Sequence, residues 1–241
     1  MERAVEILSQ YYPYLLNGLK ITVLVTLVSG ALGTAIGLVL ALMRLSMFTP
    51  FKFLVTTGLY KRNNKFIVWL AHFNPLSFIA KVYIEVIRGT PSMVQLVIFA
   101  FIIFVNTDSR FMIASVAFGI NSGAYVAELI RAGIQAVDKG QMEAGRSLGL
   151  SYGMTMRYVI IPQAVKNILP ALANEFIVLL KETSIVGVIG LDDLVRAGNI
   201  IRSRTYDAYV PLLTVAAIYL CMTLTLSNLL ARFERRLRQS D

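Results

Sequence analysis

The stretch GQMEAGRSLGLSYGMTMRYVIIPQA, Gly140 to Ala164, lies between two of the most apolar regions of the chain. It is polar, is interrupted by glycines, and carries Glu143, Arg146 and Arg157 ahead of Pro162. A polar segment between two long apolar runs indicates helices that cross a membrane and are joined here by an element outside the bilayer. Its residues alone leave open whether this element docks on a partner or is an ordinary amphipathic loop.

The composition is that of a membrane protein. Of the 241 residues 56% are hydrophobic and only 15% are charged, with a mean hydropathy of +0.67, which is far more apolar than a soluble domain of this size needs. The formal net charge is +9. In a membrane protein such an excess indicates cytoplasmic loops that face anionic lipid, and no basic patch or motif points to nucleic acid.

Long apolar runs predict the membrane spans. A bilayer core of about 30 Å needs roughly 20 residues of helix. We therefore predict an all-α, polytopic fold with one domain, 1–241, and five transmembrane helices at about 15–43, 89–107, 111–137, 160–189 and 208–231. The fourth run holds Pro162, Pro170, Glu175, Lys181 and Glu182, which indicates functional polar groups or a broken helix.

The distribution of Lys and Arg predicts the orientation. The segments 44–88, 131–166 and the tail after residue 231 hold 16 of them, against six on the other side. The N-terminus is therefore expected outside and the C-terminus in the cytoplasm, together with the loop 139–162. The apolar pieces of 51–77 are too short to span, so this segment is predicted to be a cytoplasmic insertion lying partly on the membrane surface, with Trp69 as an interfacial anchor.

Several polar residues lie within the predicted spans. Asn121, Tyr125 and Glu128 are spaced i, i+4, i+7 and share one helix face, so we predict that they line a solute path. Pairing of Glu128 with Arg131 or Arg88 is an equal alternative. Two further sets complete the candidates: Asn174 and Lys181, which share a face and could also line the path, and the structural or gating candidates Glu85, Arg88, Glu175 and Glu182.

The sequence lacks the common motifs of enzymes and metal sites. The chain has no G-x-x-x-x-G-K-[ST], no G-x-S-x-G and no H-E-x-x-H, and its only cysteine and histidine, Cys221 and His72, form no site. The sequence therefore predicts neither an enzyme nor a metal site. The spacing of Gly30, Gly33 and Gly37 predicts close helix packing.

The chain resembles the transmembrane permease subunits of bacterial ABC importers for polar amino acids. The family's cytoplasmic loop, E-A-A followed by glycine and then a hydrophobic residue and Pro, is similar to Glu143, Ala144, Gly145, Gly149, Ile161 and Pro162, with Gly145 in place of the commoner alanine. The flanking pieces YIEVIRGTP (83–91), AYVAELIRAGI (124–134) and LPALANEFIVLLKETS (169–184) extend the likeness over most of 83–198.

This resemblance implies a type I importer permease in the bacterial inner membrane. Two permease chains, alike or different, would form the path above two ATPase subunits that bind ATP and Mg²⁺, with an external solute-binding protein and no cofactor in this chain. The loop 139–162 would be a coupling helix: Ala144 and Gly145 permit close approach, Gly149 allows a sharp turn with φ above zero, and Pro162 starts the next span.

The resemblance also implies the activity, which is uptake of a polar amino acid by alternating access, driven by ATP hydrolysis on the ATPase subunits. Two alternatives stay open: an importer permease for another small solute, such as an amino-acid derivative or an osmoprotectant, or a channel or scaffold protein outside the ABC class. The coupling loop separates them, because a channel has no need of an ATPase-docking helix.

Overall fold

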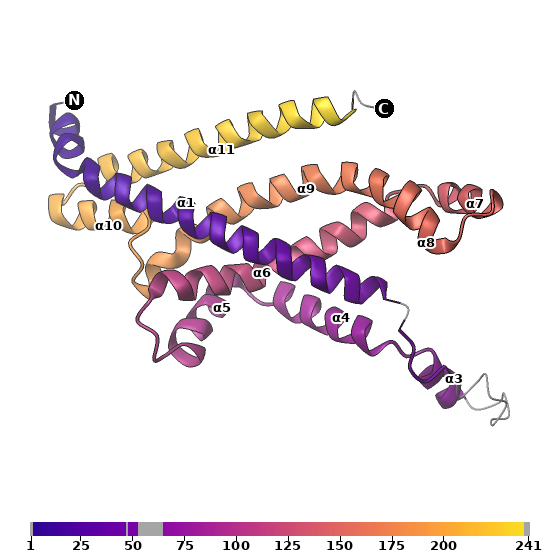
Figure 1. Ribbon diagram of the computed structural model, residues 1–241. Helices are drawn as coiled ribbons and strands as arrows, with labels where there is room; N and C mark the ends of the chain where they lie inside the picture. Colours follow the sequence, from indigo (N-terminus) through magenta and orange to yellow (C-terminus); the bar gives the residue numbers. More distant parts are fainter. Residues whose placement is uncertain (1, 47, 53–64, 239–241) are drawn as a thin grey trace.

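A computed structural model describes residues 2–46, 48–52 and 65–238, and every regular element in these ranges is a helix or helical turn. The long helices run lengthwise, with the N-terminal end of α1 and α10 at one end of the molecule and α7 at the other, where α11 also ends (Figure 1). The elements are α1 (Glu2–Leu45), α3 (Lys65–Ala71), α4 (Pro75–Arg88), α5 (Ser92–Ile98), η1 (Phe99–Ile103), α6 (Arg110–Gln135), α7 (Lys139–Ser147), α8 (Tyr152–Thr155), η2 (Met156–Ile160), α9 (Ile161–Glu182), η3 (Thr183–Ile189), α10 (Leu194–Thr205) and α11 (Tyr209–Arg238).

Small residues join α1 to α6. A Cβ atom built on Gly33, Gly37, Gly119 or Gly123 would lie between 2.5 and 2.8 Å from a side chain of the other helix. The two backbones can approach this closely only because these positions lack side chains. Many large apolar residues of α1, such as Leu27 and Leu38, are exposed, whereas Val25 and Leu40 are buried. The predicted packing role of the glycines in α1 is confirmed.

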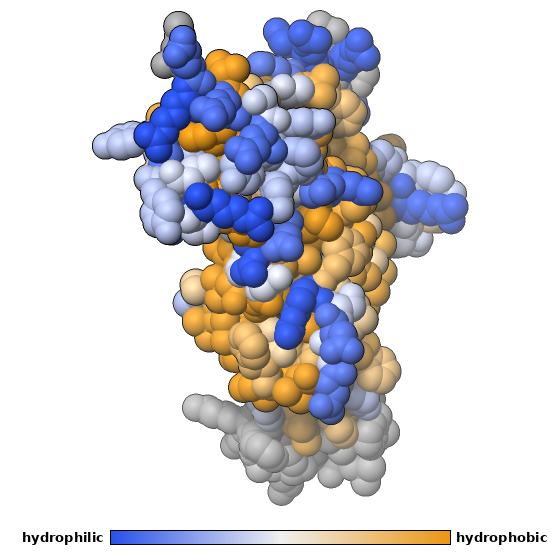
Figure 2. Space-filling view, turned by 90° about the vertical axis from the view of Figure 1, so that its left-hand side faces the viewer, coloured by the Kyte–Doolittle hydropathy of each residue, from blue (hydrophilic) through white to orange (hydrophobic). Residues whose placement is uncertain are grey.

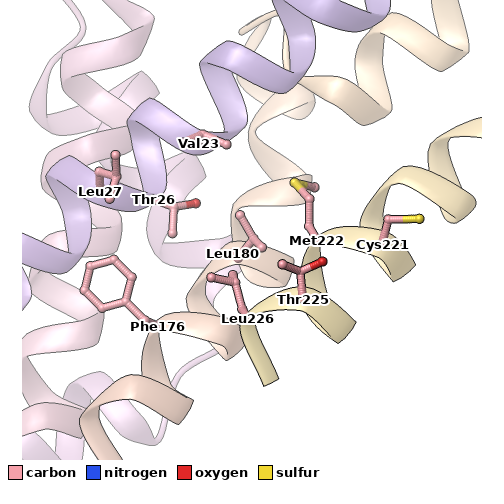
Figure 3. Close-up of a pocket in the computed structure, with 9 residues that line it drawn as sticks. All are labelled: Val23, Thr26, Leu27, Phe176, Leu180, Cys221, Met222, Thr225 and Leu226. Atoms are coloured by element: carbon pink, nitrogen blue, oxygen red, sulfur yellow. The ribbon is translucent and has the colours of Figure 1, made fainter. Parts of the chain in front are cut away.

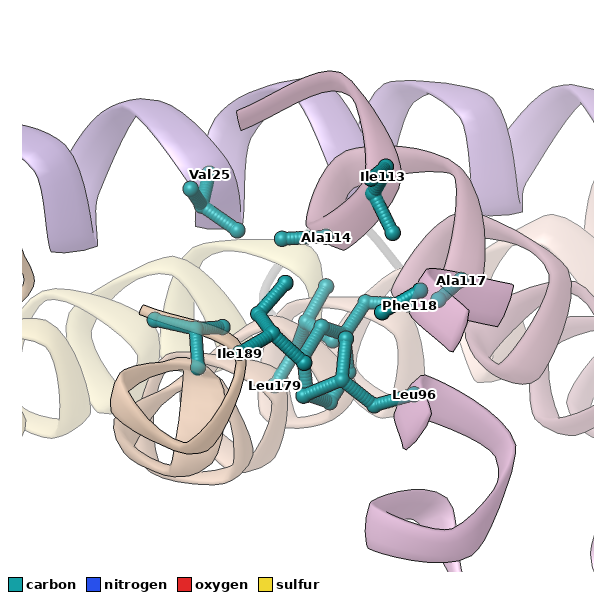
Figure 4. Packing of buried hydrophobic residues seen from close by; sticks show 10 residues of the cluster. Val25, Leu96, Ile113, Ala114, Ala117, Phe118, Leu179 and Ile189 are labelled. Atoms are coloured by element: carbon teal, nitrogen blue, oxygen red, sulfur yellow. The ribbon is translucent and has the colours of Figure 1, made fainter. Parts of the chain in front are cut away.

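Side chains from six elements form the central hydrophobic cluster. Phe118 of α6, Leu96 of α5 and Leu179 of α9 come together here, and α1 and η3 contribute Val25 and Ile189 (Figure 4). The cluster comprises Val25, Leu96, Ala100, Ile113, Ala114, Ala117, Phe118, Leu179, Val186 and Ile189.

Among the described residues, three helices are long and apolar enough to cross a membrane: α1, α6 and α11 up to Arg236. A fourth candidate is a bent pair, α4 with Ser92–Ile103, whose two parts meet at 102°. Helix α9 has 22 residues and carries the predicted charges Glu175, Lys181 and Glu182. The number of five spans and their orientation stay predictions.

The predicted span 89–107 is wrong as a single helix. Its helical part covers only Ser92–Ile103, and the helix α4 precedes it across a sharp bend. Pro91 explains the break, because proline has no N–H to continue the ladder of α4 and its ring disfavours helical geometry at Thr90. Pro91 itself is extended, with φ −61° and ψ 134°.

The predicted insertion 51–77 overlaps the start of α4, which begins at Pro75. Asn74 caps α4, its side chain accepting a hydrogen bond of 2.9 Å from the Ser77 N–H, and Pro75 occupies the first turn. Helix α4 packs on α1 and α6, so Lys81 and Arg88 belong to the bundle and not to a loop. Without these two, 14 Lys and Arg residues remain on the predicted cytoplasmic side against six on the other, so the predicted orientation is unchanged.

Residues 53–64 of this predicted insertion lie outside the described residues, and α3 follows them. Trp69 is 58% exposed, and its ring lies 5.4 Å from that of Phe73. The membrane-surface role of the segment stays a prediction.

The end of the molecule around α10 is polar. Figure 2 faces this end and shows hydrophilic side chains gathered over its upper part, above a hydrophobic surface. Asp193 caps α10 by accepting hydrogen bonds of 3.0 Å from the N–H groups of Val195 and Arg196. Burial raises the pKa of the Asp193 carboxyl, and these two bonds oppose the shift.

Candidate functional site

Helix α7 begins and ends with local signals in the sequence. Asp138 caps its start by accepting a hydrogen bond of 2.6 Å from the Gly140 N–H. At its end the N–H of Gly149 bonds to the carbonyl of Arg146 and the N–H of Leu150 to that of Gly145, both at 3.1 Å. Gly149 has a φ of +86°, which confirms the positive φ predicted for this position.

Gly145 packs α7 against α8. A Cβ atom here would lie 2.5 Å from Cγ2 of Thr155, whose side chain is fully buried. The glycine at the position where the family commonly has alanine therefore has a steric reason within this chain. Glu143 and Ala144, in contrast, are exposed. The segment therefore has an inner side, which contains Gly145, and an outer side, which contains Ala144.

Large apolar side chains are exposed at the end of α7 and on α8. Leu148 is 83% exposed, and Tyr152 and Met154 are also exposed. Exposed apolar side chains contribute to a contact surface where several of them form one patch. Sequence reasoning missed Leu148, although it stands inside the motif between Gly145 and Gly149.

Pro162 lies in the first turn of α9, as predicted, but the helical path begins earlier, at Tyr152. Between α8 and α9 the chain makes a wide π-helical turn, in which the N–H of Ile161 bonds to the carbonyl of Met156. Pro162 cannot donate to the carbonyl four residues before it and would clash with it. The wide turn lets the chain carry this proline without interrupting the helix.

Glu128 is held by two arginines. Arg44 Nη1 at the end of α1 lies 3.4 Å from Glu128 Oε2, and Arg131 Nε lies 3.0 Å from the same oxygen. Arg131 also bonds the second carboxylate oxygen through Nη2. The predicted pair with Arg131 is confirmed, while Arg44, 84 residues away in the chain, was not predicted. A direct contact of Glu128 with solute stays a prediction.

Three polar candidates from different helices lie close together. The guanidinium carbon of Arg88, at the end of α4, is 5.3 Å from the ring centroid of Tyr125 on α6. Glu175 of α9 is partly buried and lies within electrostatic range of Arg88 and Glu182. The structure therefore brings Arg88 into contact with Tyr125, a predicted member of another group, and places Glu175 in the same region.

The remaining candidates lie elsewhere. Asn121 is only 3% exposed, and its Nδ2 donates a hydrogen bond of 2.9 Å to Gln95 Oε1. Asn174 and Lys181 are exposed. Glu85 pairs at the surface with Lys81, at 3.6 Å. Gln95 was missed by sequence reasoning, although a lone amide within the apolar run 92–105 is a signal of helix contacts in membranes.

An apolar groove runs between α1, α9 and α11 (Figure 3). Among the described residues, no charged side chain and no predicted solute-path residue lines it, so it is unsuited to a polar solute. Its lining residues are Val23, Thr26, Leu27, Phe176, Leu180, Cys221, Met222, Thr225 and Leu226.

Comparison with known proteins agrees with this geometry. Residues 66–239 match the family described as binding-protein-dependent transport system inner membrane component. The arginine transport system permease protein ArtQ of Bacillus subtilis is 40% identical over 95% of this chain and 94% of its own length. The glutamine transport system permease protein GlnP of Escherichia coli K12 is 38% identical, with 94% of each chain covered.

Solved structures extend the likeness to the whole fold. A crystal structure of an amino acid ABC transporter with histidines matches with a TM-score of 0.81 and 47% identity, covering 95% of this chain and 96% of that one. The MetNI methionine ABC transporter in an inward-facing conformation shares the fold, with a TM-score of 0.71 at 20% identity and coverage of 93% and 96%. This chain therefore belongs to the inner membrane components of binding-protein-dependent transport systems, as a permease subunit of an ABC importer.

Proposed function

We propose that this permease carries a polar amino acid into the cell by alternating access, together with a second permease chain, two ATPase subunits that bind ATP and Mg²⁺, and an external binding protein. Binding of ATP below would shift the population of the bundle between its two orientations. The observation that carries the coupling part of this proposal is α7, in which Ala144 and the C-cap residue Leu148 are exposed while Gly145 packs on Thr155.

The outer side of α7 suits a protein groove. Ala144 is small enough to permit close approach, and Leu148, 83% exposed, adds apolar area next to it. Leu148→Glu should therefore abolish co-purification of the ATPase subunit, because a carboxylate would be buried without a partner. Val5→Glu is the matched control, since Val5 is 67% exposed at the opposite end of the molecule. Equal ATPase recovery with both variants would reject α7 as the docking element.

The cluster around Arg88 suits a zwitterion. The guanidinium can pair with a carboxylate of the solute, and the nearby Glu175 and Glu182 can pair with its ammonium group. The apolar groove of Figure 3 offers neither charge. Relatives named for arginine and glutamine transport support an amino acid as the solute class.

Uptake by the full complex in proteoliposomes tests the solute class. Labelled basic, acidic and amide amino acids would be compared with an amino-acid derivative and an osmoprotectant that lacks a free ammonium group. We expect ATP-dependent accumulation of at least one polar amino acid. Accumulation of the osmoprotectant alone would select the second importer class, and flux without ATP would indicate a channel.

A further inference from the structure

The bend between α4 and α5 interrupts the backbone hydrogen bonds at the end of α4. The chain turns by 102° across three residues, Gly89 to Pro91. The last carbonyl groups of α4 lose their helical partners there. Side chains can supply donors in their place.

A directed chain of hydrogen bonds crosses this bend. Asn121 Nδ2 donates to Gln95 Oε1 at 2.9 Å, and Gln95 Nε2 donates to Thr90 Oγ1 at 2.6 Å. The Thr90 hydroxyl in turn donates to the carbonyl of Val86 at 3.0 Å. Gln95 Nε2 also lies 2.7 Å from the carbonyl oxygen of Ile87 and 3.1 Å from that of Thr90. The chain thus connects α6, α5, the bend and the end of α4, and bonds arranged in this order strengthen one another.

The two amides of this chain do not face a solute. Asn121 is 3% exposed and Gln95 is 7% exposed, and both atoms of the Gln95 amide are engaged within the bend. The side chain of Tyr83 adds a separate connection, because its hydroxyl donates to the carbonyl of Ile120 at 2.8 Å. Hydrogen bonds therefore connect α6 to α4 before the bend, through Tyr83, and to α5 after the bend, through Gln95.

The same face of α6 receives Arg88. Tyr125 lies one turn after Asn121, and the Arg88 guanidinium stacks over its ring. Arg88 is also the direct neighbour of Ile87, whose carbonyl Gln95 holds. The position of the Arg88 backbone therefore depends on the Gln95 amide, while Tyr125 receives its side chain.

We propose that Gln95, Asn121 and Thr90 are positioning residues that hold the bend so that Arg88 stays over Tyr125 in the solute path. This inference rests on the proposed role of Arg88 in that path. It assigns Asn121 to the support of the path and not to its lining, and it gives Gln95 and Thr90 a function that their positions in the sequence do not reveal.

Non-additivity of variants is the first test. Gln95→Met keeps the size of the side chain but removes its donors, and we expect it to lower ATP-driven uptake per assembled complex about tenfold. Arg88→Ala should lower uptake as well. If Gln95 acts through Arg88, the double variant is no slower than Arg88→Ala alone. Reductions that multiply in the double variant would overturn the proposal. Thr90→Val should reproduce the loss, whereas Thr90→Ser, which keeps the hydroxyl, should transport like the wild type.

A distance measurement tests the bend without transport. Spin labels at Lys81→Cys on α4 and Ile102→Cys on η1, both exposed sites, report the angle of the bend in a Cys221→Ser background. We expect a broader or shifted distance distribution with Gln95→Met or Thr90→Val. Gln10→Met, which alters an exposed glutamine on α1, should leave the distribution unchanged. An unchanged distribution with Gln95→Met overturns the inference. Should Arg88→Ala leave uptake intact while the distances shift, the proposed role of Arg88 fails and the function of the amides in the bend stands.

Discussion

The interface between α1 and α6 and the segment after α7 both depend on glycine, but for different physical reasons. At Gly37 a Cβ atom would lie 2.5 Å from Cγ1 of Val126, so the neighbouring helix excludes a side chain. At Gly149 an added Cβ atom would have no packing neighbour within 4 Å among the described residues, and the constraint is the backbone, with φ at +86°. The first glycine serves packing inside the bundle, and the second serves a change of direction outside it.

This difference separates what a substitution can do. A substitution at a packing glycine destabilises the protein because the new side chain has no room, and a smaller residue on the neighbouring helix can restore the packing. A substitution at a turn glycine destabilises the protein because the new residue is strained at a positive φ, and no change in a neighbouring residue can relieve that strain. Variants at Gly37, Gly149 and Gly145 test this separation, and a variant at the exposed Ala144 provides a contrast, in order of decreasing expected effect.

Gly37→Leu should have the largest effect. The new side chain must push against Val126 and the backbone nitrogen of Ala127, which lies 3.0 Å from the Cβ position. We expect a loss of about 3 kcal/mol or more in the free energy of unfolding, or no folded protein. Thermal unfolding in detergent measures it. Leu38→Phe is the control, because Leu38 is 51% exposed and can grow outward. Equal melting temperatures for the two variants would contradict the packing role.

Ala144→Trp should leave the fold intact and weaken assembly. Ala144 is exposed on the outer side of α7, so the indole has room in the isolated permease but not in a docked ATPase subunit. Overpacking of about 1–3 kcal/mol corresponds to roughly ten- to a hundredfold weaker binding. Titration of the ATPase subunit against the permease in nanodiscs gives the dissociation constant. A wild-type constant would show that this side of α7 is not docked.

Gly149→Val should act through the backbone. A β-branched residue at a φ of +86° costs roughly 1–2 kcal/mol, and the end of α7 must change direction. We expect the complex to assemble but to hydrolyse more ATP per solute transported. Gly149→Asn tests the cause, because asparagine tolerates positive φ and should retain coupling. Equal coupling ratios in the valine and asparagine variants would argue against a conformational role.

Gly145→Ala should have the smallest effect, and a second substitution at Thr155 should reverse it. The methyl group would lie 2.5 Å from Cγ2 of Thr155, a misfit of about 1 kcal/mol that the better helix propensity of alanine partly offsets. Adding Thr155→Ala removes this atom and should restore α7. Hydrogen exchange of the α7 amides measures the local stability. If the double variant is no better protected than Gly145→Ala, the contact with Thr155 is not the reason for glycine here.

The candidate site was predictable where it depends on local sequence. The limits of α7, the turn at Gly149 and the pair of Glu128 with Arg131 three residues on all follow from short-range spacing. The parts that were missed depend on distant segments. Arg44 reaches Glu128 across 84 residues, and Gln95 meets Asn121 across 26. A single sequence contains no signal for which of several polar side chains on a helix will face which neighbour.

The sequence by itself determined the all-helical class, the apolar runs and the motif in α7, because hydropathy, helix period and turn chemistry are properties of neighbouring residues. Only the tertiary structure decided that the run starting at residue 89 is the second part of a bend, that Gly145 packs on Thr155, and that Arg88 comes to lie over Tyr125. Each of these depends on how two helices approach. That approach is set by the packing of the whole bundle, where small residues allow contact and buried polar groups require partners.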